Sequence, residues 1–341
     1  MDAGALWQEF CGMLQQAGDD LLAAAPDAAT RAEGAAYLAR LAAYGVERHL
    51  MGAARLTSGI AFSVPRIGGY NPDYRVGSAN LMGGRRYRLA GRINGAYRIG
   101  IGIYTLEPNG RIAIDDYRVL NAQAAGLDAE GRFDLRIDDE ATAELGLRPK
   151  PTSNLLLIRE IRLKPGDPPA EFALETDAPA ASAQAPSPED VARSLTSARH
   201  FIAGSLRQFL GWSNAFAARP NSIAPLDPEL DKAVQGDPGT RYYTGYFDLR
   251  DDQALVIEIP PLACDYWGVQ LTNHWLEPMA ASHLNHVTAT QDGDGVARIV
   301  IAPRDPGCPN WLATEGRSRG AIFHRTINAD RAATPRCWVR G

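Results

Sequence analysis

The residues best placed to do chemistry lie in one segment near the end of the chain, residues 266–275. Its sequence, Tyr-Trp-Gly-Val-Gln-Leu-Thr-Asn-His-Trp, has the aromatic and β-branched content of a strand. Because side chains alternate between the two faces of a strand, one face carries Tyr266, Gln270, Thr272 and His274. The other face carries Trp267, Val269, Leu271 and Trp275 and is predicted to be core. A hydroxyl, an amide and an imidazole on one surface fit either a pocket wall or a solvated sheet face.

His274 is the predicted general base or acid of this face. A histidine changes charge near neutral pH, so its imidazole can both accept and donate a proton under physiological conditions. Tyr266 is predicted to be its hydroxyl partner. A histidine that serves packing and hydrogen bonding alone is the alternative.

A proline-rich loop, residues 302–312, contains Arg304 and Trp311. Its three prolines restrict the backbone, so the loop can fix these side chains at low entropic cost. We predict that the loop closes a cavity over the face of Tyr266 and His274, and that Arg304 holds a negative charge that develops there. A rigid corner in which Trp311 fills the core is the alternative.

Glu258 lies inside the apolar run Leu255-Val256-Ile257-Glu258-Ile259. Shielding from water would raise its pKa and make it a candidate general acid or base, whereas a solvated sheet edge would make it an ordinary surface carboxylate. The residues predicted to line a substrate are mainly aromatic: Tyr243, Tyr246, Trp275, His286 and Trp311.

Metal and cofactor binding are not predicted. Imidazole suits zinc and iron sites, and four of the six histidines occur late in the chain, at His274, His283, His286 and His324. However, His283 and His286 would point to opposite faces of an extended strand. The sequence contains neither an HExxH motif nor a P-loop nor a GxGxxG motif, so we expect no metal and no cofactor.

Composition and charge limit the class of protein. The chain has 341 residues, of which 45% are apolar and 22% charged, and a net charge of −5. These values are ordinary for a globular protein and give no general field for a polyanion such as nucleic acid. Neither a signal peptide nor a membrane span is predicted. The four cysteines form no CxxC pair, so we expect free thiols in the cytoplasm. A homo-oligomer is left open.

The order of predicted elements gives a mainly β (α+β) protein with two antiparallel β-sandwich-like domains and flanking helices. We expect N-terminal helices over residues 1–60, a first β domain over 61–178, a linker and long helix over 179–220, and a C-terminal β domain over 221–341. Asn94-Gly95 between alternating segments predicts a β-hairpin. Ser187-Pro188-Glu189-Asp190 predicts the start of the long helix.

A stripe of arginines, Arg86, Arg88 and Arg92, alternates along one predicted strand. Such a stripe is typical of a solvated face that pairs with acidic residues, and an anion site is the alternative.

Three motifs together resemble a known family. Arg-Tyr-Tyr-Thr-Gly-Tyr-Phe at 241–247, the strand beginning Tyr266-Trp267 and the loop from Arg304 to Leu312 resemble the bacterial domain family DUF 1214. The resemblance covers roughly residues 240 to 328, and a weaker one, over about 66 to 105, resembles the part that often precedes this domain. The resemblance implies a β-sandwich with flanking helices and implies no established reaction.

We therefore predict a cofactor-independent acid–base enzyme, a lyase, isomerase or hydrolase, acting on a small, largely apolar, oxygenated substrate. A non-catalytic β-sandwich that binds a small ligand or a carbohydrate is the alternative, because the fold alone does not decide between them. A structural, oligomer-forming protein is a third interpretation.

Overall fold

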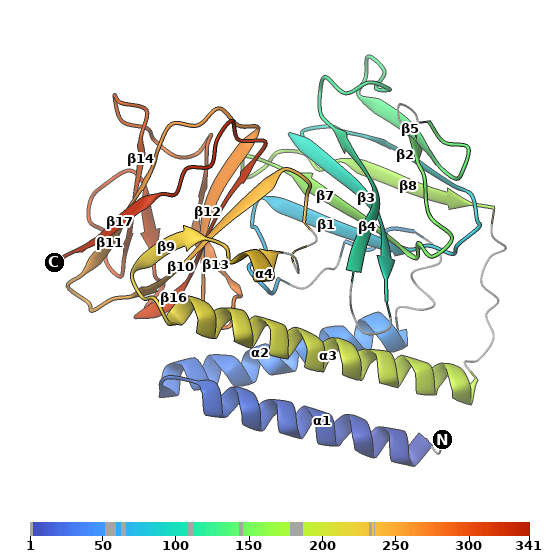
Figure 1. The fold of residues 1–341 in the computed structure, drawn as a ribbon, viewed down its shortest axis with the longest axis horizontal. Helices are drawn as coiled ribbons and strands as arrows, with labels where there is room; N and C mark the ends of the chain where they lie inside the picture. The colour runs from blue at the N-terminus through green and yellow to red at the C-terminus, as the bar shows by residue number, and fades with distance from the viewer. Residues whose placement is uncertain are drawn as a thin grey trace. The chain divides into compact units, whose positions relative to one another are not determined.

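The chain folds into two compact units (Figure 1). The computed structural model describes residues 3–51, 59–62, 66–107, 112–142, 146–177, 187–231, 234 and 236–341. Unit 1 comprises Met1–Pro65 and Asp73–Arg207, and unit 2 comprises Arg66–Pro72 and Gln208–Gly341. Residues 66–72 therefore belong to unit 2 although both of their sequence neighbours belong to unit 1. The linker predicted after residue 178 lies largely outside the described residues.

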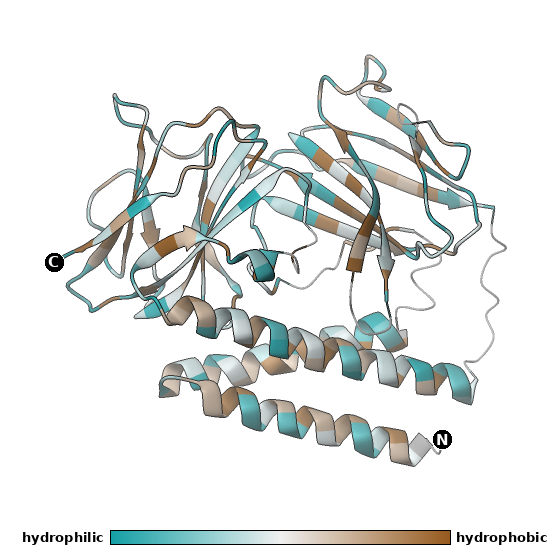
Figure 2. Ribbon diagram, viewed as in Figure 1, coloured by the Kyte–Doolittle hydropathy of each residue, from teal (hydrophilic) through white to brown (hydrophobic). Residues whose placement is uncertain are grey.

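The helices of unit 1 precede and follow its strands. They are α1 (Ala3–Ala24), α2 (Ala28–Val46), the short π-helix η1 (Glu47–Met51) and the first part of α3 (Pro188–Ala217). Hydrophilic and hydrophobic residues alternate along α1 and α3 (Figure 2), as expected for helices that bury one side. Ser187 and Asp190 exchange hydrogen bonds at the start of α3, which confirms the predicted helix start.

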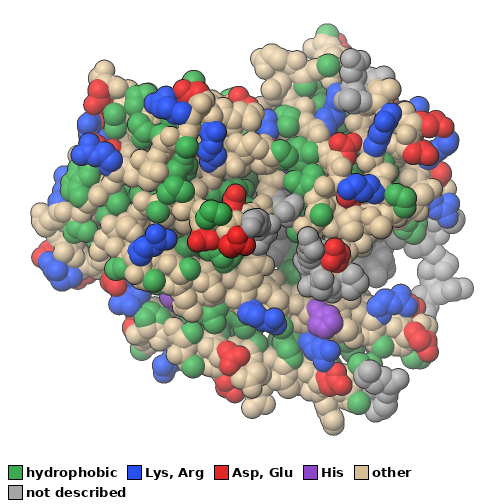
Figure 3. Space-filling model, viewed as in Figure 1, with side chains coloured by type: hydrophobic (Ala, Val, Ile, Leu, Met, Phe, Trp, Pro, Cys, Tyr) green, Lys and Arg blue, Asp and Glu red, His purple; other side chains and the backbone are tan. Residues whose placement is uncertain are grey.

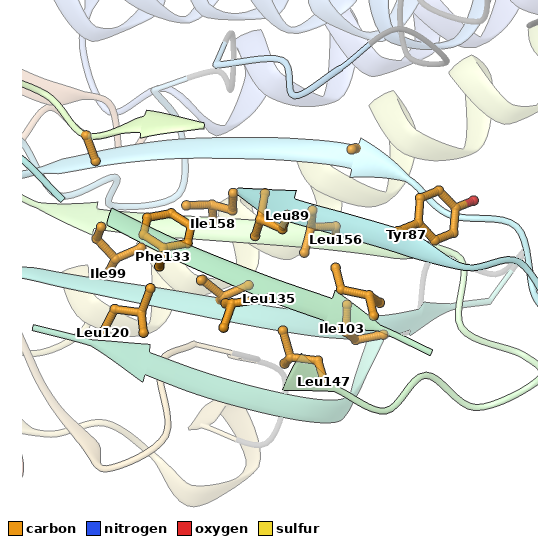
Figure 4. Close-up of a cluster of buried hydrophobic side chains, with 14 of the residues drawn as sticks. Tyr87, Leu89, Ile99, Ile103, Leu120, Phe133, Leu135, Leu147, Leu156 and Ile158 are labelled. Carbon is orange, nitrogen blue, oxygen red and sulfur yellow. The ribbon is translucent and has the colours of Figure 1, made fainter. Parts of the chain in front are cut away.

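Two facing sheets form the β part of unit 1. One sheet has the order β1 (Tyr74–Asn80), β7 (Leu155–Ile161), β3 (Arg98–Leu106), β4 (Ile112–Leu120). The other has the order β6 (Gly146–Leu147), β5 (Arg132–Ile137), β2 (Tyr87–Arg92), β8 (Glu171–Thr176). Apolar side chains from both sheets meet in a single core, which includes Leu89, Leu135, Ile103 and Leu156 (Figure 4).

The hairpin predicted at Asn94-Gly95 is wrong. Strand β2 before this turn and strand β3 after it belong to different sheets. Asn94 does adopt a left-handed backbone conformation, with φ of 44°. Its side-chain amide donates to Pro169 O at 2.9 Å, and the N–H of Gly95 donates to Pro168 O at 3.1 Å. The turn is therefore held by the segment before β8 and carries the chain from one sheet to the other.

Unit 2 is also built from two sheets. The larger has the order β13 (Pro278–Asn285), β12 (Tyr266–Thr272), β16 (Arg319–Ile327), β10 (Thr240–Asp248), β9 (Ser222–Pro225). The smaller has the order β15 (Trp311–Ala313), β14 (Ala297–Ala302), β11 (Ala254–Ile259), β17 (Arg336–Arg340). The core between them includes Phe247, Val269 and Leu271 of the larger sheet and Ile257 and Ile299 of the smaller.

A second, smaller core covers the opposite face of the five-stranded sheet. Trp212 and Phe216, from the end of α3, pack with Tyr246 and Phe323 of the sheet, and residues around the short helix α4 (Pro228–Asp231) complete this layer. Hence β10, β12 and β16 are buried on both faces. The predicted fold class, mainly β with antiparallel sandwich-like sheets, is confirmed.

Charged side chains of both signs are interspersed over the visible face of the molecule (Figure 3). The predicted pairing of the arginine stripe is an example, because Arg88 forms ion pairs with Asp134 at 2.7 Å and Glu175 at 3.1 Å. Arg86 and Arg88 line an open depression of about 650 Å³ in unit 1 together with Asp134, Asp138 and Glu175, so the charges of this depression largely neutralise one another. Across the described ranges, none of the helices has the length and apolar character that a membrane crossing requires.

Candidate functional site

The polar residues predicted on one face of residues 266–275 lie on the helix-covered face of the five-stranded sheet. In the strand register, Tyr242 of β10 pairs with Arg325 of β16, which pairs with Gly268 of β12. Side chains two residues apart along each strand therefore share this face. It carries Tyr242, Thr244 and Tyr246 from β10, Phe323 and Arg325 from β16, and Tyr266, Gln270 and Thr272 from β12. Most of this face is buried and Tyr242 and Thr244 are half-buried, so the solvated alternative does not describe it.

His274 sits in the turn that follows β12 and forms a hydrogen-bonded group with Tyr246 and Ser213. The Tyr246 hydroxyl is 2.7 Å from His274 Nδ1, and Ser213 Oγ is 3.3 Å from the same nitrogen. Ser213 Oγ also donates to the backbone oxygen of His274 at 2.5 Å. Only 4% of His274 is exposed, so the imidazole is held in one orientation in a largely dry environment.

Ser213 resembles a nucleophile beside a histidine, but its hydrogen bonding shows a different role. Activation of a serine requires its hydroxyl proton to point at the imidazole. Here the proton goes to a backbone carbonyl oxygen, and the serine is fully buried. Ser213 therefore anchors α3 to the turn of His274.

Arg325 is the charged residue of this buried face. Its Nη1 donates to Gln270 Oε1 at 3.2 Å and its Nη2 donates to the carbonyl oxygen of Gly69. The guanidinium lies 5.8 Å from the centre of the Tyr242 ring and 5.7 Å from that of Phe323. Within the described ranges, none of its partners carries a negative charge, and its Nε has no hydrogen-bond partner.

Residues 66–72, here called the strap, lie across this face. Gln270 Nε2 donates to Gly69 O at 3.0 Å and to Tyr70 O at 2.7 Å, and Asn71 Nδ2 donates to the Tyr266 hydroxyl at 2.8 Å. Gly68 and Gly69 both have positive φ, 64° and 74°, a conformation that glycine adopts without steric cost. The two glycines thus let the strap lie close to the sheet.

His324 and Tyr243 face the opposite way, into the core between the two sheets. His324 is fully buried, its Nδ1 is 3.1 Å from Gly268 O, and its ring centre is 5.2 Å from that of Tyr243. Burial lowers the pKa of His324 to about 4 because it disfavours the charged imidazolium. Tyr243 belongs to this inner core, and so the structure separates it from the face of His274.

Three of the other predicted residues lie on or beside the strap-covered face. The Trp275 ring centre is 4.8 Å from that of His274, and the Tyr246 ring is perpendicular to the His274 ring. The ring of His286 is 5.8 Å from that of Tyr266. The structure therefore brings Tyr246 and Trp275 to His274, while Tyr266 and His286 form a separate pair.

The predicted closure of a cavity by the loop of Arg304 and Trp311 is wrong. Trp311 begins β15 of the smaller sheet and packs with Val256, Val300 and Ala302 on the outer face of that sheet. Arg304 is exposed in the same loop. Because both sheets and their shared core lie between this loop and His274, Arg304 and Trp311 do not join the histidine.

Glu258 lies on the outer face of the smaller sheet. Its neighbours in the register are Arg298 and Arg336. Its carboxylate pairs with Arg298 at 2.8 Å and with Arg336 at 3.6 Å. Alternation along β11 accounts for this position, since the flanking Ile257 and Ile259 fill the core while Glu258 points away from it. It is a cross-strand ion-pair residue, distant from His274.

Two residues of this face escape the sequence analysis: Ser213, which anchors α3, and the buried charge Arg325. The helix that contains Ser213 is recognisable, but nothing local indicates which turn its hydroxyl meets 61 residues later. A weak signal exists for Arg325, since it interrupts the apolar strand Ala321–Ile327 in the same way that Glu258 interrupts β11. The outcomes differ because β16 is a central strand covered on both faces.

Among the residues that the structure describes, no three His, Cys, Asp or Glu side chains are grouped so that they could hold a metal ion. A cavity of about 300 Å³ in unit 2 is lined by Val256, Arg298, Trp338 and neighbouring residues of the smaller sheet. It lies on the outer face, near Glu258 and away from His274.

Comparison with family models matches the chain to a family that is related to, but different from, the one predicted from the sequence. The family model that matches is "Protein of unknown function (DUF1254)", over residues 213–340. DUF1254 is related to the DUF 1214 family named above but has a different number. The match begins at Ser213, so it contains the sheets of unit 2 and leaves out the strap. No curated protein matches the chain.

Solved structures similar to this chain share its fold over nearly its whole length. An uncharacterized protein of Burkholderia cenocepacia is 29% identical, with a TM-score of 0.91, covering 99% of this chain and 97% of that one. A protein of Vibrio parahaemolyticus is 12% identical, with a TM-score of 0.52, covering 88% of this chain and 96% of that one. The second likeness concerns the fold alone.

Proposed function

We propose that unit 2 is a cofactor-independent acid–base enzyme, a lyase, isomerase or hydrolase, that acts on a small, largely apolar, oxygenated substrate through His274. The observation that carries this proposal is the fixed imidazole of His274, with its Nδ1 at 2.7 Å from the Tyr246 hydroxyl. Proton transfer by a positioned histidine contributes about 10²–10⁴-fold to a rate. A preorganised, shielded imidazole is suited to that task.

We propose that the Tyr246 hydroxyl donates to His274 Nδ1 across their 2.7 Å contact, which leaves the ring proton on Nε2. In this tautomer Nε2 gives its proton to the substrate while Nδ1 takes the Tyr246 proton, and the reverse transfer restores both groups, so His274 and Tyr246 act as one proton relay. Tyr246 replaces Tyr266 as the proposed hydroxyl partner.

The residues proposed to line the substrate differ from those predicted from the sequence, because only Tyr246 and Trp275 lie beside His274. Trp275 and Tyr246 stay beside His274, and Phe323 and Trp212 continue the same apolar layer. Such a surface suits an apolar substrate with few oxygen atoms. It also suits a non-catalytic module that binds a small ligand or a carbohydrate, which is the competing function.

The test combines a screen with a pair of matched substitutions in the full chain. A thermal-shift panel of aromatic, terpenoid and sugar compounds selects binders, and mass spectrometry then records whether each is converted. For a converted compound, His274→Gln should lower turnover at least about 100-fold. The control His200→Gln, at an exposed position of α3, should leave turnover unchanged. Tyr246→Phe should shift the pH profile, because it removes the hydrogen bond that fixes the imidazole.

Two results separate the proposed enzyme from its competitor. A compound that stabilises the protein and is recovered unchanged supports the binding module. Full turnover by a folded His274→Gln variant would show that this histidine does no chemistry.

We also place the protein in the cytoplasm. All four cysteines, Cys11, Cys264, Cys308 and Cys337, are free, and free thiols are typical of reducing compartments. The proposal includes a small-molecule substrate and a homo-oligomer. Light scattering tests the latter, since an assembly would have a multiple of the chain mass of 36.8 kDa.

A further inference from the structure

We propose that Arg325 is the anion-binding group of a second site on the strap-covered face of unit 2, which takes a small aromatic carboxylate in place of the Gly69 carbonyl oxygen. This inference goes beyond the acid–base function proposed for His274 and does not rest on it. Four observations carry it: an uncompensated charge, an Nε donor without a partner among the described residues, two aromatic rings and a strap that occupies the neighbouring donor Nη2.

The charge of Arg325 is buried without compensation. Only 8% of the residue is exposed, and a guanidinium does not lose its proton at physiological pH. Within the part of the chain that the structure describes, its partners are an amide oxygen, a carbonyl oxygen and two rings. Burying an ion costs several kcal/mol unless an opposite charge offsets it. A residue kept at this cost is expected to meet its counter-charge in a bound ligand.

The arrangement of donors indicates a carboxylate. A carboxylate accepts two parallel N–H bonds from one edge of a guanidinium. On the edge formed by Nε and Nη2, Nε has no hydrogen-bond partner among the described residues, and Nη2 donates to Gly69 O. Nη1, on the far side, is held by Gln270. One carboxylate oxygen would therefore take Nε and the other would displace Gly69 O from Nη2, while the bond to Gln270 fixes the guanidinium plane.

The aromatic part of the proposed ligand follows from the two rings beside the guanidinium. Tyr242 and Phe323 lie at similar distances from the guanidinium carbon, 5.8 Å and 5.7 Å. A planar apolar body attached to the carboxylate would contact these rings, and aromatic pairs contribute about 0.5–1.5 kcal/mol beyond the area they bury. Inorganic anions gain no such contact.

The strap competes with the ligand for Nη2. Displacing Gly69 O also breaks the bond that Gln270 donates to it at 3.0 Å. The rest of the strap stays attached, because the N–H of Gly69 donates to Leu276 O, Gln270 also donates to Tyr70 O, and Asn71 donates to Tyr266. The glycine backbone at Gly68 and Gly69 lets this part of the strap change conformation at low steric cost. Only a local movement is then needed for the ligand to reach Arg325.

The test uses 4-fluorobenzoate as the probe and fluorine NMR on the full chain. Binding should be saturable, and the neutral analogue 4-fluorobenzamide should bind at least tenfold more weakly to the same unaltered protein. Arg325→Met should weaken 4-fluorobenzoate at least tenfold, as expected for a lost hydrogen bond to a charged group. Arg325→Lys should also weaken it, because lysine keeps the charge but lacks the paired donors.

The control variants are Arg241→Met and His274→Gln. Arg241 is an exposed arginine of β10 that donates to the backbone oxygen of Ala329, and both variants should bind the probe within twofold of the parent. Equal binding of 4-fluorobenzoate and 4-fluorobenzamide to the parent chain overturns the proposal, and this result needs no variant. Displacement of the probe by inorganic phosphate at equal concentration overturns the assignment to an aromatic carboxylate. Undiminished binding to Arg325→Met overturns the assignment of the residue.

Discussion

The two units differ in the partners that surround a buried charged side chain. In unit 1, Glu160 is fully buried, and its carboxylate faces Arg75 at 3.1 Å and Arg162 at 3.7 Å and accepts from the N–H of Ala170 at 2.9 Å. Burial still raises the pKa of Glu160, because desolvation outweighs these favourable contacts. In unit 2, Arg325 is almost as buried, and the described residues give it only neutral partners.

This difference in partners separates a buried charge that supports the fold from one that is a candidate for function. A buried ion with opposite charges around it can be explained by the fold alone. An ion without them is destabilising in the isolated fold, and such residues gather at functional sites. His324 sharpens the contrast, because it neighbours Arg325 in sequence and is also buried. Histidine can give up its proton and become neutral, whereas arginine cannot.

The largest effect is expected for Arg75→Met in unit 1. Removing this arginine leaves the Glu160 carboxylate buried with less compensation, and breaking such a pair costs about 3–5 kcal/mol. We expect the free energy of unfolding of unit 1 to fall by about 3 kcal/mol. Hydrogen exchange of the amides in β7, which contains Glu160, should become faster, and mass spectrometry measures this rate.

A matched control for this variant is Arg88→Met, which removes an arginine from an exposed group of ion pairs in the same unit. Exposed pairs contribute about 0–1 kcal/mol, so exchange in β7 should hardly change. Equal losses for the two variants would contradict the special role given to the buried pair.

A smaller effect, located in unit 2, is expected from acidification. The folded-state pKa of His324 is about 4, below the unfolded value of about 6.5, so the unfolded chain binds the proton first. Its contribution to stability is present above pH 6.5 and is lost as the pH falls toward 4. Between pH 7 and pH 5 we expect a loss of about 2 kcal/mol from this group. Urea unfolding followed by tryptophan fluorescence measures it.

His324→Phe is the variant that checks the origin of this slope. It removes the titrating group while keeping a ring against Tyr243. Unit 2 of this variant should lose about 2 kcal/mol less than the parent between the same two pH values. An unchanged slope would assign the acid sensitivity to other groups.

The third effect, at Glu258, should be smaller still. Glu258→Gln removes one acid from an outer-face network in which Arg298 also pairs with Asp292 and Asp294. Because Arg298 keeps two acidic partners, the free energy of unfolding should change by less than about 1 kcal/mol. Thermal unfolding measures this change. A loss of several kcal/mol would contradict the assignment of Glu258 as an ordinary ion-pair residue of the outer face.

The smallest effect is expected for Arg325→Met in the absence of any anion. The variant loses two hydrogen bonds and also removes an uncompensated buried charge, so these contributions should nearly cancel, within about 1 kcal/mol. Urea unfolding in anion-free buffer tests this. A loss as large as that of Arg75→Met would show that Arg325 serves the fold by anchoring the strap.

Alternation along strands made much of the site predictable from sequence. The period of two placed Tyr266, Gln270 and Thr272 on one face and Trp267 and Leu271 in the core, because a central strand permits only these two directions. The same rule became unreliable where the strand ended. His274 reaches Tyr246 through the turn after Thr272. Trp275 is buried as predicted, but it packs beside His274 instead of sharing the face of Trp267 and Leu271, because that turn breaks the alternation.

The order of strands within sheets could not be read from the sequence. Arg304 and Trp311 follow the strand Ala297–Ala302, and nothing local indicates that this strand belongs to the smaller sheet. The Asn94-Gly95 turn has the composition of a hairpin, yet contacts with Pro168 and Pro169 decide its role. The partners of Arg325 depend on contacts of the same kind, distant in sequence.

The strap also has a consequence for the time at which unit 2 can be completed during synthesis. Gly69 leaves the ribosome 256 residues before Arg325, to which it hydrogen-bonds. At about 5–20 residues per second, this segment waits between about 10 and 50 seconds for its partner. Unit 2 is therefore the last part of the chain to close, although one of its segments is among the first to be made. A slow stretch of codons within residues 73–207 would lengthen the wait without altering a single amino acid.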